Sequence, residues 1–563
     1  MNNILFDYTK YYSSPDYEQD FKHNKGLKEL PFSGLLNPEK VGNLESLIET
    51  FKSKTKKNPK DDLSFYLWAL TLSNLKRYNE ALERFQTACD INPNYFESYF
   101  NWGKILYELG RFEEAEDKFI KALDIKPANY EAIFYYAIVL FKLAKLQKSI
   151  DYFKLASQAN SGDYRVYYNL AVALYQNGQF AESSDYFEKA QQLNSEDYDL
   201  YFNWGNALYQ NGQFEEAVRK YKEATSLKPE TSEAVFNLGM CQFSLQNFDE
   251  AISQYTKALE INPLDASALN NLGVTLCEQN HYEKALSKYE KAALINPNND
   301  KLFNNWGVAL TKLNKYPEAR DKYEKALGLN DHSSILFSNF GILLTETDEA
   351  GKAVINYEQS IDINPKNARA HNNLGIALSK LGRYEEAIQQ FKEAVKLNPE
   401  NKAAYNNWEI TLNHFSQDYE NKLDPAYSNS YIELGDSFLR FEEYEKSIKL
   451  YETAQKINRD ELHIDVLVNL GKCYFNIKNY VKSNELFKKS LEVISDDAEV
   501  HNYLALTLYE LGHFEESQFH FERAKQLKPS IKDLNFNLGN VLYKLEEYSS
   551  SIELYHKALQ EKA

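Results

Sequence analysis

The sequence repeats itself with a period of 34 residues, and this period constrains the fold more than any other feature. All five tryptophans are separated by multiples of that period: Trp68, Trp102, Trp204, Trp306 and Trp408. A small residue follows in the same phase in ten consecutive units: Ala69, Gly103, Ala137, Ala171, Gly205, Gly239, Gly273, Gly307, Gly341 and Gly375. A fixed period of this length is the signature of a repeat architecture, in which each unit packs mainly on its neighbours.

Two amphipathic helical patterns fill each unit, as in the segment from Tyr201 to Pro229. Gly212 separates the two patterns, and Pro229 stops the second one. The first stripe comprises Tyr201, Trp204, Gly205 and Leu208, and the second comprises Phe214, Ala217, Tyr221 and Ala224. We therefore predict a helix-turn-helix pair whose small residues let two backbones approach closely. In six units the small residue of the second helix is a serine of similar size: Ser149, Ser183, Ser447, Ser483, Ser517 and Ser551.

These residues resemble the consensus of the tetratricopeptide repeat (TPR) family, which has the same period. Segments such as "AHNNLGIALSKLGRYEEAIQQFKEAVKLNPENKAAYNNW" resemble in particular the repeat domain of O-linked N-acetylglucosamine transferase. The resemblance implies an all-α solenoid, wound as a right-handed superhelix of about fourteen helix pairs, with the first helices on the concave side. It also implies a scaffold that binds other proteins.

The repeat pattern predicts five segments along the chain. Residues 1–41 lack the repeat and are rich in aromatic side chains, and residues 42–61 contain an orphan helix that caps the array. Ten repeats in strict register fill residues 62–401, and four more fill residues 428–563. Residues 402–427 between them form a degenerate half repeat.

The half repeat contains "NNWEITLNHF", in which Glu409 stands where Gly307 stands in "NNWGVALTKL". Only residues 416–426 separate Phe415 from the next first helix, so a complete second helix cannot fit. A carboxylate can replace glycine there because no second helix presses on it. We predict a seam near residues 409–427. One interpretation is a hinge between two arrays, and the other is a deletion without function, bridged by a short helix.

An asparagine two residues before the small position recurs on the inner stripe of the first helices. A primary amide donates and accepts hydrogen bonds at once, which matches the backbone of an extended peptide whatever its side chains. The arrangement resembles the asparagine ladder of O-linked N-acetylglucosamine transferase; the alternative is that these amides only satisfy neighbouring helices. Four of them follow another asparagine: Asn270, Asn304, Asn372 and Asn406. The predicted peptide-binding residues are Asn101, Asn169, Asn203, Asn237, Asn271, Asn305, Asn339, Asn373, Asn407, Asn469 and Asn537.

A second candidate surface lies earlier in the array, where the inner stripe is apolar although a solvated concave face should be polar. Such a patch could anchor side chains of a partner, or its rings could pack between adjacent helices. Its predicted members are Phe100, Phe134, Tyr135, Ile138, Phe141, Tyr168, Tyr175 and Phe202. The aromatic residues of segment 1–41 favour docking of that segment along an apolar groove, in cis or on a partner, over a flexible tail.

Composition excludes several classes of partner and site. The net charge of −18 disfavours nucleic acid, since no basic stripe is present. The four cysteines lie far apart without metal-ligand spacing, which argues against zinc and against a disulfide framework and favours a reducing compartment. No apolar run reaches the length of a membrane span, and the N-terminus carries no recognised targeting signal, so we expect a cytoplasmic protein without membrane insertion.

No motif for catalysis, metal binding or a cofactor is found, and no catalytic domain is expected. We therefore expect a non-catalytic scaffold that binds one or more proteins as extended segments, as a subunit of a larger assembly such as a ciliary or cytoskeletal complex. One alternative is a regulatory or substrate-recruiting subunit of an enzyme complex. A chaperone adaptor is disfavoured, because the lysine of the carboxylate clamp is replaced by aromatic residues or asparagine.

Overall fold

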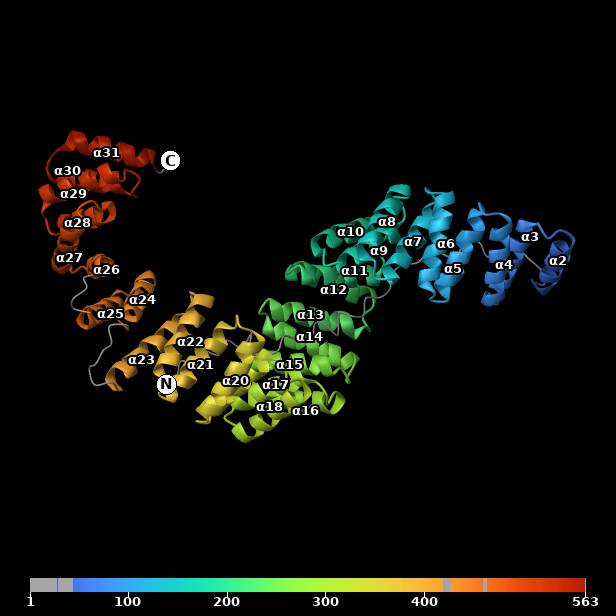
Figure 1. Ribbon diagram of the computed structural model, residues 1–563, viewed down its shortest axis with the longest axis horizontal. Coiled ribbons are helices and arrows are strands. Elements are labelled where there is room, and N and C mark those ends of the chain that lie inside the picture. The colour runs from blue at the N-terminus through green and yellow to red at the C-terminus, as the bar shows by residue number, and fades with distance from the viewer. Residues whose placement is uncertain (1–27, 29–43, 419–426, 459–462, 562–563) are drawn as a thin grey trace. The chain divides into compact units, whose positions relative to one another are not determined.

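A computed structural model describes residue 28 and residues 44–418, 427–458 and 463–561. The described residues form helices connected by short turns, with no β-strand among them. The described residues divide into two compact units, an N-terminal unit that ends at Asp331 and a C-terminal unit that begins at His332. Within each unit, consecutive helices run antiparallel and stack side by side (Figure 1).

The described part of the N-terminal unit consists of one single helix followed by eight helix pairs. Its helices are α2 (Leu44–Lys57), α3 (Asp62–Asn74), α4 (Tyr78–Ile91), α5 (Phe96–Glu108), α6 (Phe112–Ile125), α7 (Tyr130–Lys142), α8 (Leu146–Ala159), α9 (Tyr164–Gln176), α10 (Phe180–Leu193), α11 (Tyr198–Gln210), α12 (Phe214–Leu227), α13 (Ser232–Ser244), α14 (Phe248–Ile261), α15 (Ala266–Glu278), α16 (Tyr282–Ile295), α17 (Asp300–Lys312) and α18 (Tyr316–Leu329).

Among its described residues, the C-terminal unit contains six helix pairs and one further helix, α23. Its helices are α19 (Ser334–Glu346), α20 (Ala350–Ile363), α21 (Ala368–Lys380), α22 (Tyr384–Leu397), α23 (Lys402–Asp418), α24 (Ser428–Arg440), α25 (Tyr444–Ile457), α26 (Ile464–Asn476), α27 (Tyr480–Val493), α28 (Ala498–Glu510), α29 (Phe514–Leu527), α30 (Leu534–Lys544) and α31 (Tyr548–Gln560). The predicted all-α solenoid of about fourteen helix pairs is confirmed.

Each pair is closed by contact between the small residue of the first helix and an aromatic ring of the second. A Cβ atom added to Gly273 would lie 2.5 Å from the Tyr289 ring, and one added to Gly205 would lie 2.6 Å from the Tyr221 ring. Both rings are fully buried. Glycine is therefore required at these positions, because a side-chain carbon would overlap the ring.

Alanine occupies the small position only where the facing ring is phenylalanine. The pairs are Ala69 with Phe85, Ala137 with Phe153, Ala171 with Phe187 and Ala505 with Phe521, and all eight side chains are buried. Wherever the ring is tyrosine, the small residue is glycine. In several of these pairs the tyrosine hydroxyl extends to a polar group of the first helix, as in the 2.6 Å hydrogen bond that Tyr221 Oη donates to Asn206 Oδ1.

The six serines of the second helices bind the first helices directly. Each hydroxyl donates a hydrogen bond to the carbonyl oxygen of the small residue; Ser183 Oγ lies 2.7 Å from the oxygen of Ala171, and Ser447 Oγ lies 2.7 Å from that of Gly435. The same bond recurs at Ser149, Ser483, Ser517 and Ser551. Serine therefore preserves the close approach that its size predicts and adds a hydrogen bond across the pair.

The turn between the two helices of each pair contains a residue in the left-handed conformation. Gly110 and Gly178 adopt it without cost, whereas Ala144 and Gln246 adopt it with φ angles of 56° and 60°. At Ala144 the turn is closed by hydrogen bonds from Ala144 N to Phe141 O and from Lys145 N to Leu140 O, the pattern that satisfies the last carbonyls of a helix.

Helix α23 carries Glu409 at the small position of its repeat. Burial raises the pKa of the partly buried Glu409, and the charges of Lys446 and Lys449 on α25 offset part of this effect. Helix α23 also contacts the elements after it, because the rings of Phe415 and Tyr427 lie 4.7 Å apart. Residues 419–426 lie outside the described residues, so the seam and its role as a hinge stay predictions.

Replacing Gly273 with Ala is expected to destabilise the N-terminal unit by about 2 kcal/mol, because the added methyl group overlaps the Tyr289 ring. Denaturant unfolding monitored by circular dichroism measures the loss. Adding Tyr289→Phe should recover part of it, since alanine and phenylalanine already pair in other repeats. A wild-type unfolding midpoint for Gly273→Ala would contradict this account of the packing.

Replacing Ala144 with Gly is expected to raise the free energy of unfolding by roughly 0.5–1 kcal/mol, because glycine adopts the left-handed conformation without a steric penalty. The matched control is Ala137→Gly in helix α7, where the same substitution lies inside a helix and should destabilise the chain. Equal losses of stability in both variants would show that the turn at Ala144 carries no strain.

A histidine pair joins α28 to α29 in the C-terminal unit. The Nδ1 atoms of His501 and His520 lie 2.8 Å apart, and His501 Nε2 lies 3.0 Å from the carbonyl oxygen of Ser495. Since that carbonyl can only accept, His501 Nε2 carries a hydrogen and His501 Nδ1 accepts from His520. Burial and the neighbouring His501 lower the pKa of His520 to about 4.

The C-terminal unit is therefore expected to lose stability as the pH falls from its neutral value. Between the ordinary pKa of 6.5 and the folded value of about 4, the unfolded chain binds more protons at His520, so the free energy of unfolding decreases as the pH falls through this range. Denaturation midpoints at pH 7 and pH 5 measure this. The variant His520→Gln should show a smaller pH dependence, because glutamine does not titrate. Glutamine fits this position, since in an earlier repeat Gln390 occupies the place of His520 and its Oε1 lies 2.8 Å from Nδ1 of His371, the counterpart of His501.

Candidate peptide-binding site

The inner face of the N-terminal unit binds the main chain of a residue from outside the repeats. Asn169 on α9 accepts a hydrogen bond from Lys28 N at 2.7 Å through Oδ1, and its Nδ2 donates to Lys28 O at 2.7 Å. One amide thus satisfies both polar groups of one peptide residue. This is the hydrogen-bond pattern that the sequence predicts for an asparagine ladder.

The side chain of Lys28 is bound in the same place. Its Nζ lies 2.8 Å from Asp199 Oδ2 and 3.1 Å from Asp197 Oδ2. The ammonium group also lies 5.2 Å from the centre of the Tyr168 ring, within the range of a cation–π interaction. The side chain of Lys28 is 22% exposed, so its ion pairs are sheltered from solvent.

Local helix geometry positions the two carboxylates. Asp197 caps the N-terminus of α11, where its side chain accepts a hydrogen bond from Asp199 N at 3.0 Å. Asp199 lies in the first turn of the same helix. Tyr168 precedes Asn169 on α9, the adjacent first helix, and its hydroxyl accepts a 2.7 Å hydrogen bond from Asn203 Nδ2 of α11. The site therefore bridges two consecutive repeats.

The electrostatics of the site favour a cation. Burial lowers the pKa of the Lys28 ammonium group, but the hydrogen bond to Asp199 and the charges of Asp197 and Asp199 outweigh it, so the pKa is raised above its ordinary value. Burial, with the charges of Asp199 and Asp197, raises the pKa of Tyr168. Lys28 is charged and Tyr168 is neutral at physiological pH.

The other predicted asparagines are mostly buried on the first helices, and several bridge neighbouring repeats. Asn101 donates to Tyr66 Oη at 3.1 Å, Asn237 to Asn206 Oδ1 at 3.1 Å, and Asn407 to Asn372 Oδ1 at 3.0 Å. Asn339 is buried in α19, and Asn537 is partly buried in α30. The side chains with a polar atom that has no hydrogen-bond partner among the described residues include Asn101, Asn203, Asn271 and Asn373.

The doubled asparagines connect one first helix to the next. Asn270 Nδ2 donates to Asn271 Oδ1 at 3.3 Å, and Asn305 Nδ2 donates to Asn270 Oδ1 at 3.1 Å. Asn372 Nδ2 donates to Asn373 Oδ1 at 3.2 Å in the same way. These contacts give the doubled residues a role in packing, whereas Asn169 instead binds Lys28.

The predicted apolar patch is not left open on the inner face. Six of its eight side chains are buried, and Phe141 and Tyr175 are partly buried. The ring of Phe134 lies 5.9 Å from that of Phe153, and the ring of Tyr168 lies 5.9 Å from that of Phe187, so these aromatics pack on the second helices. The packing interpretation accounts for these contacts, and binding of a partner by the patch stays a prediction.

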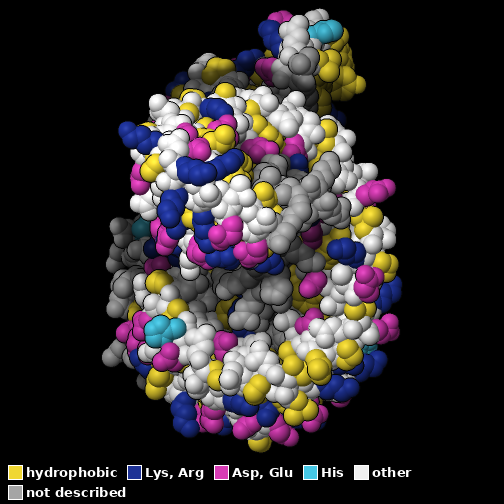
Figure 2. Space-filling model, turned by 90° about the vertical axis from the view of Figure 1, so that its right-hand side faces the viewer, with side chains coloured by type: hydrophobic (Ala, Val, Ile, Leu, Met, Phe, Trp, Pro, Cys, Tyr) yellow, Lys and Arg dark blue, Asp and Glu magenta, His cyan; other side chains and the backbone are white. Residues whose placement is uncertain are grey.

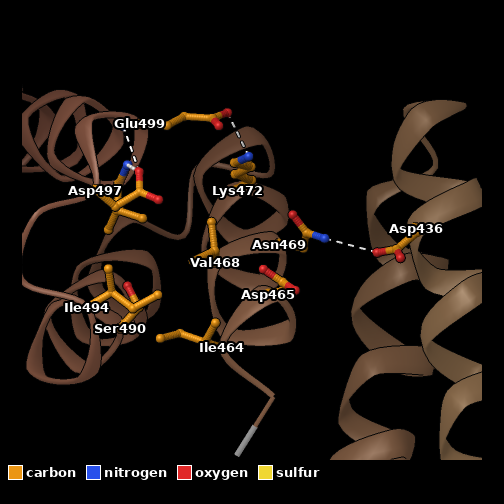
Figure 3. A pocket seen from close by; sticks show the side chains of 11 residues that line it. Asp436, Ile464, Asp465, Val468, Asn469, Lys472, Ser490, Ile494, Asp497 and Glu499 are labelled. Carbon is orange, nitrogen blue, oxygen red and sulfur yellow. Dashed lines mark hydrogen bonds and ion pairs between the residues drawn. The ribbon is translucent and has the colours of Figure 1, made fainter. Parts of the chain in front are cut away.

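A pocket of about 300 Å³ lies in the C-terminal unit in the same register as the Lys28 site (Figure 3). Asn469 on α26 corresponds to Asn169, and Asp497 and Glu499 at the start of α28 correspond to Asp197 and Asp199. Asn469 Nδ2 donates to Asp436 Oδ1 at 2.9 Å, and Lys472 Nζ lies 2.7 Å from Glu499 Oε1. At this site the positive charge is Lys472 of the preceding first helix, whereas at the N-terminal site it is Lys28, from outside the repeats.

Beyond these sites, charges of both signs are mixed on the face of the molecule drawn in Figure 2, where Lys and Arg side chains are interspersed with Asp and Glu. No group of His, Cys, Asp and Glu side chains that could hold a metal ion is found among the described residues. Within the same part of the chain, no helix is long and apolar enough to cross a membrane.

The sequence indicated part of the Lys28 site. Asn169 and Tyr168 are among the residues predicted for the inner face, Asn169 in the asparagine ladder and Tyr168 in the apolar patch. Lys28 and Asp197 were missed. The available signal for Asp197 is its acidic neighbour two residues later, a combination that few repeats share. Lys28 lies in a segment without a repeat, 141 residues from Asn169, and no pattern connects the two.

The paired helices and the peptide contact on the inner face define a helical-repeat protein. TPR family models match residues 74–110, 96–129, 164–197, 202–266, 254–287, 341–382, 368–401, 428–461 and 498–531, more than half of the chain. The protein belongs to the TPR family, whose repeats act as scaffolds for protein–protein interaction. An architecture built of these repeats is typical of non-catalytic scaffolds.

Several solved structures are similar in fold to this chain. The APC/C hetero-tetramer Cut9–Hcn1 is 15% identical over 88% of this chain and 99% of that chain, with a TM-score of 0.35. YrrB, described as a TPR protein with an unusual peptide-binding site, is 24% identical over 33% and 95%, with a TM-score of 0.28. MamA is 25% identical over 31% and 95%, with a TM-score of 0.28. No curated protein sequence matches the chain.

Proposed function

We propose that this protein is a non-catalytic scaffold that binds an extended polypeptide along the inner face of its N-terminal unit, through the side-chain amides of its first helices. The pair of hydrogen bonds between Asn169 and the main chain of Lys28 carries the proposal. Because those bonds involve only main-chain atoms of the bound residue, any extended segment can make them.

The unsatisfied polar atoms of neighbouring asparagines support an extended ligand. Asn101 and Asn203 each keep a side-chain oxygen without a partner among the described residues, and both oxygens are buried. Leaving a buried acceptor unpaired costs about 1–3 kcal/mol, so a main-chain N–H of a ligand at either position would be favourable. Asn203 follows Asn169 by one repeat, so the two amides can contact the same segment.

The scaffold function extends to assembly with other proteins. We propose that the protein acts as a subunit of a larger complex, in which a partner contributes the extended segment. A cytoplasmic, ciliary or cytoskeletal setting rests on family analogy, and a regulatory or substrate-recruiting subunit of an enzyme complex is the alternative. The asparagine ladder does not distinguish between these settings, because main-chain contacts recognise no particular sequence.

The test compares partners that co-purify with the wild-type chain and with Asn169→Ala/Asn203→Ala. We expect at least one partner to fall about tenfold in the variant, because two charge-neutral main-chain contacts are lost. Quantitative mass spectrometry of the purified complexes measures the change. The matched control is Asn211→Ala, an exposed asparagine in the turn after α11. The same partner levels in all three samples would refute the ladder as the binding surface.

A further inference from the structure

The two carboxylates of the Lys28 site form a combination that recurs once. Among the first helices from α3 to α30, acidic residues occupy both the N-cap position and the position two residues later only at Asp197 and Asp199 before α11, and at Asp497 and Glu499 before α28. Two carboxylates in one helix turn repel each other, and a cation between them relieves this repulsion. A positive partner is therefore favourable at each pair.

The C-terminal pair obtains its cation from the neighbouring repeat. Lys472 on α26 reaches Glu499 at 2.7 Å across the first helices (Figure 3). The residue of α9 that corresponds to Lys472 is Val172, which is buried and apolar. The N-terminal pair thus lacks the internal lysine, and an ammonium group from another segment takes its place.

Lys28 supplies that ammonium group, and three features of its contacts are those of a side-chain subsite. Its Nζ lies 2.8 Å from Asp199 and 3.1 Å from Asp197, and it lies above the Tyr168 ring. The main chain of the same residue is held by Asn169. Side chain and main chain of one residue are therefore bound together, which fixes the register of an extended segment.

We propose that Tyr168, Asp197 and Asp199 form a subsite for a lysine side chain of an extended peptide, and that Lys28 fills this subsite as a tethered competitor of a lysine-bearing partner segment. The inference rests on the proposed function, since Asn169 must hold the backbone for the side chain to reach the carboxylates. The subsite adds a preference for lysine to the main-chain contact with Asn169, which by itself recognises no particular sequence.

Occupancy by Lys28 is tested on the full chain with a carbodiimide, which joins an amine directly to a carboxylate in contact with it. We expect mass spectrometry to find Lys28 joined to Asp197 or Asp199, because the atoms lie within hydrogen-bond distance. The variant Asp197→Asn/Asp199→Asn should lose this product, while the Lys472–Glu499 product serves as an internal control. Recovery of the control product without the Lys28 product would overturn the cis contact.

The preference for lysine is tested with the full-length variant Lys28→Glu, whose carboxylate is repelled from the subsite. The probe is a labelled peptide of residues 22–34, in which Lys22 and Lys25 are replaced by serine so that only Lys28 remains. A second peptide carries norleucine, the uncharged isostere, in place of Lys28. We expect the lysine peptide to bind about tenfold more tightly by fluorescence anisotropy, as two sheltered ion pairs warrant.

Matched variants separate the subsite from the backbone contact. In the Lys28→Glu background, Asp197→Asn/Asp199→Asn should reduce the affinity for the lysine peptide to that for the norleucine peptide, whereas Asp497→Asn/Glu499→Gln should leave both unchanged. Asn169→Ala should weaken both peptides alike. The wild-type chain should bind the lysine peptide at least about tenfold more weakly than Lys28→Glu, because its own Lys28 competes.

The outcomes distinguish this inference from the proposed function. Equal affinities for the two peptides, both weakened by Asn169→Ala, would overturn the lysine subsite and leave the backbone contact intact. Peptide binding that is insensitive to Asn169→Ala would overturn both. Equal binding by the wild-type chain and Lys28→Glu would overturn competition in cis, and no binding of either peptide at millimolar concentration would overturn the subsite for a partner.

Discussion

The close contact between a small residue of the first helix and a buried ring of the second is the interaction on which the architecture depends. At Gly205 and Gly273 there is no room for a single carbon atom, so the distance between the two helices is set by backbone against ring. The same close approach recurs along the described pairs. Repeating units present equivalent positions of successive first helices, and a ladder of amides depends on this repetition.

Most of the fold could be predicted from the sequence, because the repeat encodes it many times. The pattern of a single helix pair would not identify the repeat. The tryptophans from Trp68 to Trp408, which recur at multiples of 34 residues, establish its period. Finer features needed the structure. The serines were expected only to fit, and their hydrogen bonds to facing carbonyls, as at Ser183, depend on side-chain direction. Likewise, strain at Ala144 in a turn follows from a backbone angle that composition does not reveal.

The residues of the candidate site that lie at repeat positions could be predicted from the sequence, whereas Lys28, which lies outside the repeats, could not. The position of Asn169 is periodic, so its place on the inner face follows from helical geometry. What its amide binds depends on a contact across 141 residues with a segment outside the pattern. Equivalent asparagines also differ in use: Asn305 bonds to Asn270, whereas Asn169 binds main chain. A single periodic residue thus serves both packing and recognition, and its neighbours decide between them.

The tether between Lys28 and the repeats sets a threshold for any ligand. A segment attached to its own binding site is present at an effective concentration of about a millimolar, whatever the concentration of the protein. A free segment that uses one subsite is present at the micromolar concentrations of most cellular proteins. It therefore cannot displace a tethered segment whose effective concentration is about a millimolar. A ligand that contacts several repeats together has the advantage, since its further contacts add to those that it shares with Lys28. The N-terminal unit would therefore discriminate by length of contact, responding to long segments and ignoring short ones that carry the same lysine.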